Sequence, residues 1–389
     1  MKKQSLDERF NKYAVRFLKT ALEELLSKQI SRRNALLSCE QFNRILIKDS
    51  VCFQVDETLA EYFPGSGGSG SGANVRIQFE YDLLSGKIVD LSLNAFNDQD
   101  ARNSTMTLDV INEGDLIIRD LAYMHIAALK GILRNLGHFL CRLQSKRQVY
   151  QLQGDKVIEL DFAQTVKVME EFGIDKLEEK VFLDKALTLE VRLFIYLLPQ
   201  EVYQARIRKA EQSARKKGRQ LTREFKTRCR LNLFITSAAK ELISIDSAWR
   251  AYTLRWQIEL GFKVWKSLWK IDKVKKVKKE RLECYIWSKL FIIALCWQTL
   301  CTINSILLRV DGKSLSFYKA SKTLIHTLGR LKQALLNGAV STVQYLLAFL
   351  DISRRRHLLE KRKNGNYSPE ILFSTFSLRR DSEVISIDW

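Results

Sequence analysis

The order of short apolar runs in the first third of the sequence constrains the fold most. Residues 43–55, NRILIKDSVCFQV, are rich in β-branched and apolar side chains, which predicts a buried strand with Asp49 at or near its C-terminal end. Residues 75–82 and 87–96 alternate apolar and polar side chains around the turn LLSG, which predicts a β-hairpin. Another short strand, LIIRD, ends at Asp120. The first third of the chain therefore contains several strands, and two of them are predicted to end at or near an aspartate, Asp49 and Asp120.

Helical periodicity separates these strands from a further one. Residues 98–112 and 122–135 have the apolar spacing of helices, and GHFLCRLQ at 137–144 is the next strand-like run. Strands that alternate with helices are typical of an α/β domain. Between the first strand and the hairpin, FPGSGGSGSGAN at 63–74 predicts a flexible loop, which is either an engineered linker or a natural connection between two strands.

The composition changes after residue 144. The strand-like runs KVIELDF, ALTLEVRLFIYLL and RCRLNLFITS are separated by a basic stretch at 205–228, which predicts a β-rich insertion with an exposed cationic arm. Helical periodicity then continues from residue 238 to near the end. The predicted regions are an N-terminal helical region at 1–42, the first part of the α/β core at 43–143, the β-rich insertion at 144–237, the second part of the core at 238–310 and a C-terminal helical region at 311–389.

The charge balance indicates a polyanionic partner. The chain of 389 residues has 64 Lys and Arg against 44 Asp and Glu, a formal net charge of +20. An excess of this size favours nucleic acid or an anionic membrane surface over a small acidic substrate. Besides the stretch at 205–228, basic residues cluster at 273–281 and 354–363.

Cysteine usage and apolar segments indicate a cytoplasmic protein that does not enter a membrane. The seven cysteines show no CxxC spacing, which favours reduced thiols. The N-terminus has charges throughout and predicts an amphipathic helix instead of a signal peptide. Residues 290–309 are long and apolar enough to span a bilayer, but Gln298 and Asn304 are among the polar residues that interrupt them, which favours a buried core helix.

One amphipathic helix is predicted over residues 251–270, AYTLRWQIELGFKVWKSLWK. At about 100° per residue, four polar side chains fall within an arc of about 60°, and small and apolar side chains form a stripe on another face. Glu259 is then displayed among cations, as a site that binds both a divalent metal and phosphate requires. The alternative is a plain surface helix on which Glu259 pairs with Lys263, four residues later. The polar set is Tyr252, Arg255, Glu259 and Lys266, and the stripe is Leu254, Ile258, Gly261, Trp265 and Leu268.

Other residues carry weaker signals. His125 and His138 lack the spacing of metal ligands and are expected to be ordinary packed or surface residues. Asp115 is expected to be a loop or capping acid. Three tryptophans could stack on an extruded base, although the place of one in the apolar stripe favours a core position for it. These are Trp256, Trp265 and Trp269, of which Trp265 belongs to the stripe.

The spacing Y-(2)-R-(3)-E-(6)-K at residues 252–266 resembles that of bacterial DDE transposases of the insertion-sequence-four family. KDS at 48–50 and GDLIIRDLAY at 114–123 are similar to the family's two strands that carry aspartates, so the resemblance extends over roughly 43–310. The sequence departs from the family where Asp49 lacks the Thr that often completes Asp-Ser-Thr and where Leu121 replaces the commoner Arg. Asp56 is the competing candidate for the first aspartate.

The resemblance implies a ribonuclease-H-like catalytic core that the β-rich insertion interrupts. Three carboxylates on it would hold two Mg²⁺ ions, or Mn²⁺, because hard cations take carboxylate and phosphate oxygens. These are Asp49, Asp120 and Glu259. The expected DNA contacts are Arg255 and Lys266 to phosphates, Tyr252 to the DNA end, and Trp256 and Lys263 beside them.

The implied reaction is cut-and-paste transposition of an insertion sequence. The ends of the element would be hydrolysed, pass through a hairpin intermediate and be joined to target DNA. The implied partners are double-stranded DNA and a second copy of the chain, in the bacterial cytoplasm at the nucleoid. The N-terminal region is a candidate for DNA binding, and the C-terminal region for dimerisation or DNA binding. Two alternatives are a catalytically inactive DNA-binding descendant of a transposase and a membrane-surface protein that uses residues 290–309.

Overall fold

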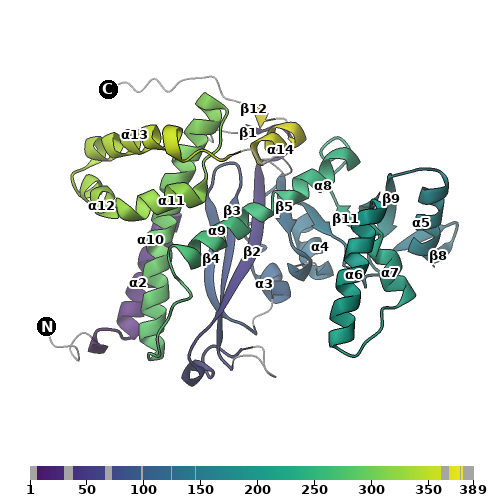
Figure 1. Cartoon of the computed structure of the whole chain (residues 1–389), viewed down its shortest axis with the longest axis horizontal. Coiled ribbons are helices and arrows are strands. Elements are labelled where there is room, and N and C mark those ends of the chain that lie inside the picture. Colours follow the sequence, from purple (N-terminus) through teal and green to yellow (C-terminus); the bar gives the residue numbers. More distant parts are fainter. Residues whose placement is uncertain are drawn as a thin grey trace. The chain divides into compact units, whose positions relative to one another are not determined.

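A computed structural model describes residues 7–29, 38–65, 72–97, 100–123, 125–144, 146–360, 368–376 and 378–379. The chain forms two compact units. The first unit combines Met1–Gln99 with Leu254–Trp389, and the second unit is the continuous stretch Asp100–Thr253. Both units combine strands with helices, so the predicted α/β class is confirmed (Figure 1).

The first unit contains an antiparallel sheet in the order β4-β3-β2. The strand predicted at 43–55 and the predicted hairpin are confirmed. Asp49, however, lies in the middle of its strand and not at the C-terminal end, because pairing with β3 continues as far as Gln54 opposite Asn74. The strands are β2 (Arg44–Gln54), β3 (Asn74–Asp82) and β4 (Ile88–Ala95).

The predicted loop at 63–74 connects β2 to β3. Pro64 forms a bridge with Ala73, and the Gly65 amide donates to the Gly72 carbonyl at 2.9 Å. Residues 66–71 of this prediction lie outside the described residues. Within the described chain, the stretch therefore joins two neighbouring strands through paired ends.

The rest of the first unit is mainly helical, as predicted for the C-terminal region. The short elements are η1 (Glu57–Leu59), η3 (Leu307–Asp311) and the paired β1 (Ser38–Cys39) and β12 (Leu378–Arg379). The helices are α2 (Lys12–Ser27), α9 (Trp256–Ser267), α10 (Lys279–Ile306), α11 (Phe317–His326), α12 (Leu328–Leu336), α13 (Ala339–Arg356) and α14 (Ser368–Thr375).

Helix α10 contains most of the apolar segment 290–309. Within the described chain, Lys279–Asp311 is the one helical stretch long and apolar enough to cross a membrane, and half of its most apolar window is buried inside the protein. Leu290, Ile293 and Ile303 are buried. The expectation that this segment packs inside the protein is confirmed.

An aromatic cluster holds α9 and α10 on β3. Phe79 lies with its ring centroid 6.2 Å from that of Phe262, 5.0 Å from that of Trp265 and 5.4 Å from that of Trp297. Trp265 is only 2% exposed, which confirms its expected place in the core. In Figure 1, α9 lies across the strands β3 and β2.

The single helix predicted over 251–270 is wrong. The chain forms α8 (Ile245–Thr253) and then α9, with Leu254 and Arg255 in a turn between them. The Gln257 amide bonds the Leu254 carbonyl at 3.0 Å, a spacing of three residues, and the Thr253 hydroxyl bonds the Arg250 carbonyl at 2.6 Å. Such local bonds satisfy carbonyls at a helix end and interrupt the regular ladder. The apolar stripe is nevertheless buried except for half-buried Leu268.

The second unit contains strands in the order β5-β6-β11-β10-β9-β7-β8. β5 and β6 are parallel and the other pairs are antiparallel, with α4 forming the crossover that parallel strands require. The strands are β5 (Asp115–Arg119), β6 (His138–Arg142), β7 (Tyr150–Gln153), β8 (Lys156–Glu159), β9 (Lys176–Phe182), β10 (Glu190–Leu197) and β11 (Leu231–Thr236). The strands predicted from LIIRD and GHFLCRLQ are thus confirmed.

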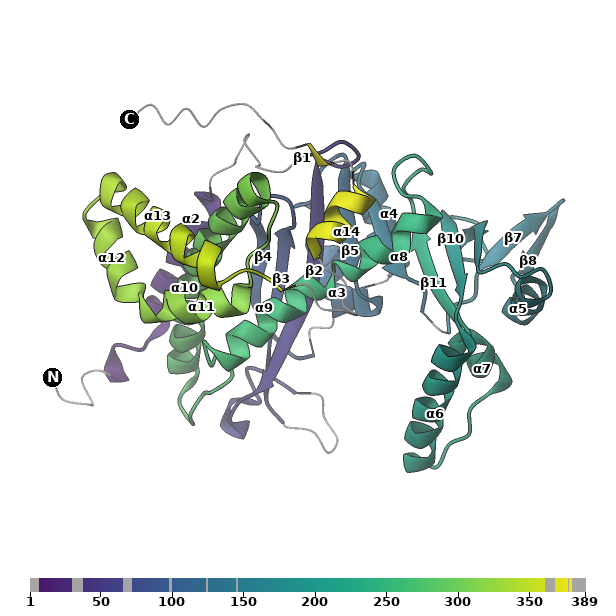
Figure 2. The same ribbon diagram turned by 45° about the horizontal axis from the view of Figure 1, so that its top comes forward.

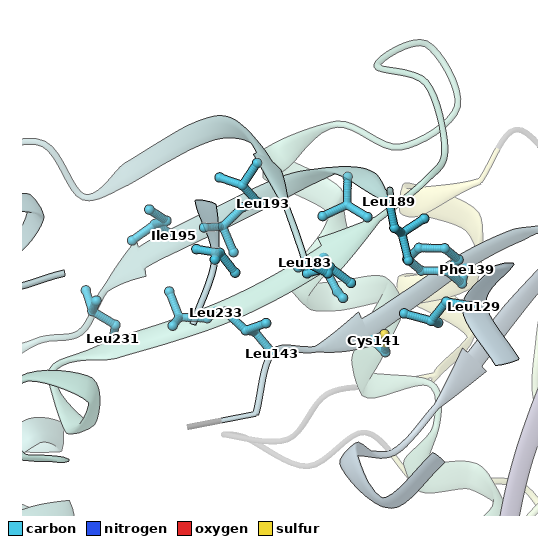
Figure 3. Close-up of a cluster of buried hydrophobic side chains, with 14 of the residues drawn as sticks. Leu129, Phe139, Cys141, Leu143, Leu183, Leu189, Leu193, Ile195, Leu231 and Leu233 are labelled. Carbon is cyan, nitrogen blue, oxygen red and sulfur yellow. The ribbon is translucent and has the colours of Figure 1, made fainter. Parts of the chain in front are cut away.

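The core of the second unit lies between this sheet and its helices. Figure 3 shows Leu129 of α4 beside Phe139 and Cys141 of β6, and Leu193 of β10 belongs to the same buried cluster. Burial raises the pKa of the Cys141 thiol to about 12, which keeps it protonated. The helical elements are α3 (Asp100–Met106), η2 (Leu121–Tyr123), α4 (Ile126–Arg134), α5 (Phe162–Glu171), α6 (Gln200–Lys216), α7 (Arg223–Cys229) and α8.

Trp265 and Trp256 lie on the same helix and differ sharply in burial, so they form a matched pair for a stability test. Trp265→Ala should lower the free energy of unfolding by about 3–5 kcal/mol, because it empties a fully packed aromatic site. Trp256→Ala should change it little, since that ring is 57% exposed. Urea denaturation of the two variants and the parent measures both effects, and equal losses would contradict the aromatic cluster as the anchor of α9.

His357, at the C-terminal end of α13, should make the stability depend on pH. Burial, Lys319 and Arg356 lower the pKa of this imidazole, which lies 2.9 Å from the Thr323 hydroxyl and 3.1 Å from the Ser353 hydroxyl. The folded protein favours neutral His357, so this stabilisation is full above the unfolded pKa of about 6.5 and is lost as pH falls through the folded pKa.

His357→Asn should therefore weaken the loss of unfolding free energy between about pH 7.5 and pH 5. Denaturation curves at several pH values measure this loss in the variant and the parent. Some dependence should persist, because burial also lowers the pKa of His138. Identical pH profiles would show that His357 contributes nothing.

Candidate active site

The register of β2 and β3 directs Asp49 toward α9. Asp49 is directly opposite Phe79, and directly opposite residues of an antiparallel pair point to the same face of the sheet. Phe79 contacts Phe262 and Trp265 of α9 on that face. The carboxylate of Asp49 therefore lies under the helix that carries Glu259.

Arg255 joins these two acidic residues. Its Nη1 lies 2.8 Å from Asp49 Oδ2 and its Nη2 lies 2.8 Å from Glu259 Oε1. The side chain of Arg255 is 8% exposed, that of Asp49 is 20% exposed and that of Glu259 is 38% exposed. Two carboxylates from distant parts of the chain thus face one cation.

This geometry also decides between two interpretations of Glu259. The ion pair across one helical turn is made with Arg255, four residues earlier, and not with Lys263 as the alternative predicted. Lys263 is exposed and lines a cavity of about 780 Å³ in the first unit, and no ion pair of its side chain occurs within the described ranges. Lys266 donates from Nζ to the Cys52 carbonyl of β2 at 3.0 Å.

Trp256 and Trp269 differ in their surroundings. Trp256 is exposed, and the Arg255 guanidinium lies 5.8 Å from its ring centroid. Trp269 is half-buried against an apolar cluster that includes Cys296 and Leu300. Of the three tryptophans, Trp256 is therefore the one with a ring face available to a ligand.

Asp120 and Tyr252 lie together in the second unit. Asp120 directly follows β5, and the Tyr252 hydroxyl donates to its Oδ1 at 3.2 Å. Tyr252 is buried, with its ring centroid 5.1 Å from that of Phe234 on β11. A buried tyrosine thus orients the carboxylate of Asp120.

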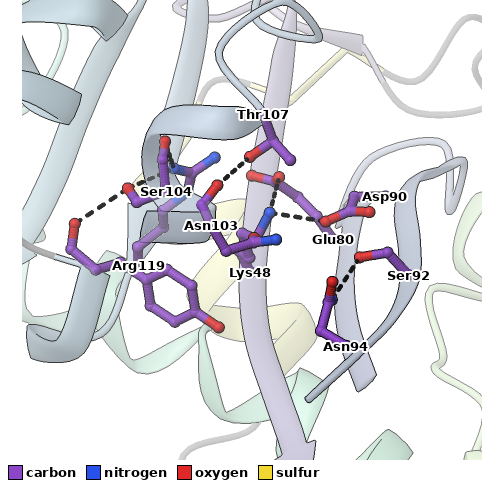
Figure 4. A network of polar contacts seen from close by, with 10 residues as sticks. Lys48, Glu80, Asp90, Ser92, Asn94, Asn103, Ser104, Thr107 and Arg119 are labelled. Carbon is purple, nitrogen blue, oxygen red and sulfur yellow. Dashed lines mark hydrogen bonds and ion pairs between the residues drawn. The ribbon is translucent and has the colours of Figure 1, made fainter. Parts of the chain in front are cut away.

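Arg119, the residue before Asp120, is held by Ser104 of α3. Its Nη1 donates to the Ser104 hydroxyl at 3.0 Å and to the Ser104 carbonyl at 3.3 Å, as Figure 4 shows for this pair. The Ser104 hydroxyl in turn donates to the Tyr123 carbonyl at 3.1 Å. These bonds fix the chain on both sides of Asp120.

Lys48 is a structurally important residue that the sequence analysis missed. It is fully buried, and its Nζ lies 3.3 Å from Glu80 Oε2 and 2.8 Å from Asp90 Oδ2. Figure 4 labels these three residues and marks both contacts with dashed lines. Since successive side chains of a strand point to opposite faces, Lys48 lies on the face away from Asp49. The signal was present in the sequence, because a lysine inside an apolar strand needs acidic partners on neighbouring strands.

The weaker candidates have local structural roles. Asp56 caps η1 by accepting from the Thr58 amide at 3.1 Å and the Thr58 hydroxyl at 2.6 Å, and these bonds lower its carboxyl pKa. Asp115 lies at the buried first position of β5 and not in a loop, and it caps the preceding turn by accepting from the Asn112 amide at 2.7 Å. His125 is exposed at the start of α4, and burial lowers the pKa of half-buried His138.

The acidic residues near Arg255 suit a hard cation. Among the described residues, no group of three or more His, Cys, Asp or Glu is arranged to hold a metal ion. Asp49 and Glu259 belong to the first unit and Asp120 to the second. Two carboxylates that already share one cation are nevertheless the donor type that Mg²⁺ takes, so these residues fit that ion.

Comparison with known proteins gives a consistent family. The family model of the transposase DDE domain matches residues 40–296. The transposase for insertion sequence element IS231F of Bacillus thuringiensis subsp. israelensis is 32% identical over 389 residues, which cover 95% of this chain and 80% of that protein. The transposase for insertion sequence element IS1151 of Clostridium perfringens is 30% identical over 380 residues, which cover 92% of this chain and 79% of that protein.

Replacing Arg255 should reveal the cation preference of the two carboxylates. Arg255→Gln should lower the unfolding free energy of the metal-free protein by about 1–3 kcal/mol, because it leaves Asp49 and Glu259 without their shared cation. Solvent screening of Glu259, which is more than a third exposed, keeps this loss at the low end. Millimolar Mg²⁺ should then raise the melting temperature of the variant more than that of the parent.

Arg281→Gln is the matched control for this comparison. It removes an exposed ion pair in which Nη1 lies 3.0 Å from Asp7 Oδ1, so its cost should stay below about 1 kcal/mol. Mg²⁺ should stabilise this control and the parent equally. If Mg²⁺ raises the melting temperature of Arg255→Gln no more than that of the control, Asp49 and Glu259 are ion-pair partners of Arg255 and not a cation site.

Proposed function

The chain belongs to the transposase DDE domain family, and we propose that it moves an insertion sequence by a metal-dependent cut-and-paste reaction. The proposal places it in the insertion-sequence-four family. In this proposal the ends of the element are hydrolysed, pass through a hairpin intermediate and are joined to target DNA. Double-stranded DNA, at the ends and at the target, is the substrate.

The observation that carries this proposal is the bridge made by Arg255. Asp49 on β2 and Glu259 on α9 are far apart in sequence, yet both carboxylates contact the same guanidinium at 2.8 Å. A position that attracts one cation between two carboxylates supports their assignment as metal ligands. Bound there, Mg²⁺ or Mn²⁺ would activate an attacking oxygen and stabilise a leaving one at the DNA phosphate.

Asp120 is the proposed third ligand, in a ribonuclease-H-like arrangement of the core. Its hydrogen bond from Tyr252 supports this role, because the partners that orient a metal ligand also tune it. The resemblance to the insertion-sequence-four family implies that Tyr252 positions the DNA end. We propose that it acts there while it orients Asp120.

Arg255 and the cations of α9 are proposed to hold the DNA end. Arg255 presents a planar fork of donors that suits a phosphate as well as a carboxylate, and Lys266 is an exposed ammonium about two turns beyond Glu259. Lys263 and the exposed ring of Trp256 lie on the same helix and extend this surface. Trp256 could stack on a base at the opened end.

A dimer on DNA in the bacterial cytoplasm, at the nucleoid, completes the proposal. Leu336 of α12 with Val340 and Leu347 of α13 are exposed apolar side chains in the C-terminal region. Exposed apolar patches are typical of surfaces that bind a partner, which supports this region as the dimer contact. The N-terminal region at 1–42 is proposed to contribute to DNA binding.

Glu259→Gln tests the proposed chemistry. The variant keeps the size and helix propensity of the side chain and should fold and bind element ends. Loss of a direct ligand should reduce Mg²⁺-dependent nicking by more than the roughly 10- to 100-fold typical of residues that only support a ligand. Gel shift and nicking assays on DNA with the element's own ends measure the two properties.

Glu61→Gln, at an exposed position of the first unit, is the control and should nick like the parent. Nicking by Glu259→Gln at the parent rate would leave Glu259 as an ion-pair partner without a catalytic role. A parent protein that binds the ends but cleaves in neither Mg²⁺ nor Mn²⁺ would favour the alternative of an inactive DNA-binding descendant.

A further inference from the structure

The positive charge of the chain is concentrated in one part of the second unit. Residues 200–230, which include α6 and α7, hold eleven Lys and Arg against three Glu, a net charge of +8 out of +20 for the chain. They account for a small fraction of the length. The contacts that these cations make inside the fold show which of them are available to a partner.

Four of the eleven have partners inside the second unit. Arg206 donates to the Leu231 carbonyl at 3.2 Å, and the guanidinium of buried Arg228 lies 3.6 Å from the Phe162 ring centroid. Arg230 pairs with Glu170 at 2.9 Å, and Lys226 lies 3.9 Å from Glu211. The other seven are exposed and form no ion pair within the described residues. We call these seven the α6 arm: Arg208, Lys209, Arg215, Lys216, Lys217, Arg219 and Arg223.

Helix α6 presents four of the seven arm residues on one face. At about 100° per residue, Arg208, Lys209, Arg215 and Lys216 fall within an arc of roughly 120°. Ala214 is buried on the opposite side, where the helix contacts its own unit. Figure 2 shows α6 extending past β10 and β11 of the same unit. From Arg208 to Lys216 the charged face is therefore directed to solvent.

The two other basic clusters are neutralised in part by nearby acids. In the cluster at 273–281, Lys276 lies 3.9 Å from Asp56 and Arg281 pairs with Asp7 at 3.0 Å. At the end of α13, Arg354 pairs with Asp311 at 2.9 Å and Arg355 pairs with Asp351. The α6 arm has no such acidic partners, so its charge is the most available to an external anion.

We propose that the α6 arm binds the phosphate backbone of duplex DNA without regard to base sequence, as a surface separate from the carboxylate site. From Arg208 to Lys216 the helix rises about 12 Å, and one DNA strand presents a phosphate about every 3.4 Å along the axis. Four cations on one face can therefore meet three or four successive phosphates. Long flexible cations position a duplex without reading its bases.

The inference rests on the proposed function and names a second part of its substrate. A chain that inserts DNA must hold target duplex whose sequence differs from that of the element's ends. A surface that contacts phosphates alone suits this target duplex. The carboxylate site and α9 would then hold the end that is cut.

The test compares two variants that each lose four charges. The arm variant is R208Q/K209Q/R215Q/K216Q, and Gln keeps the helix propensity of α6. The control variant K156Q/K167Q/K180Q/K185Q removes four exposed lysines of the same unit outside the arm. Thermal melting confirms that both variants fold. Fluorescence anisotropy then measures the binding of a labelled random-sequence duplex between about 50 and 200 mM salt.

The arm variant should reduce the slope of log affinity against log salt by about 0.9 for each lost phosphate contact, or up to about 3.6 for four. The loss of affinity between about 50 and 200 mM salt should then shrink by about 100-fold relative to the parent. The control variant should keep the parent's slope. An unchanged slope in the arm variant, or an equal change in the control, would overturn the proposal.

Two further measurements separate this inference from the proposed function. The arm variant should still nick element-end DNA in Mg²⁺ at low salt, because none of its four residues belongs to the carboxylate site. A parent that never nicks would refute the proposed function and leave the anisotropy result intact. A loss of affinity confined to element-end duplex, with random duplex bound as before, would refute sequence-independent binding by the arm.

Discussion

The packing of aromatic rings around Phe79 is the contact on which the candidate site depends. Phe262 and Trp265 of α9 and Trp297 of α10 all meet this one ring on β3. Aromatic pairs of this kind add about 0.5–1.5 kcal/mol each beyond the area that they bury, and their geometry is specific. Because Asp49 is the register partner of Phe79, the contact that anchors α9 also fixes the helix over that carboxylate.

Strand β2 places opposite charges on its two faces at adjacent positions. Lys48 is buried between Glu80 and Asp90 on one face, and Asp49 meets Arg255 on the other. A buried charge is tolerated only when it is paired, so each face needs its own partners from neighbouring elements. The Lys48 cluster can hold β2, β3 and β4 in register without a metal, and under the proposed function the Asp49 face would exchange Arg255 for a metal ion.

The sequence predicted the elements that depend on local pattern and missed the features that depend on distant partners. The hairpin, the core helix α10 and the buried stripe with Trp265 follow from periodicity. The end of β2 did not follow, because the length of β3 decides how far pairing continues. The break between α8 and α9 could not be predicted from the sequence either. It falls at Thr253 and Leu254, where no Gly or Pro signals the end of a helix.

The same distinction applies to the site. The spacing of Tyr252, Arg255, Glu259 and Lys266 singled out, by its resemblance to a family, the segment in which Arg255 pairs with Asp49 and Glu259. The bond of Arg255 to Asp49 joins residues 206 positions apart, which no local pattern encodes. Lys48 could have been found, because its strand position and the acids of the next hairpin are visible in the sequence.

Which cations are buried and which are exposed indicates more about function than the net charge of +20 does. Arg255, Lys48 and Arg228 are cations that the fold buries, and their contacts shape the protein. The α6 cations Arg208, Lys209, Arg215 and Lys216 are exposed, so they are not desolvated until a partner binds, and each contributes little to stability. Evidence for a polyanionic partner therefore lies in exposed cations that form no ion pair within the described chain, and the α6 arm supplies seven of them outside the family's Y-(2)-R-(3)-E-(6)-K spacing.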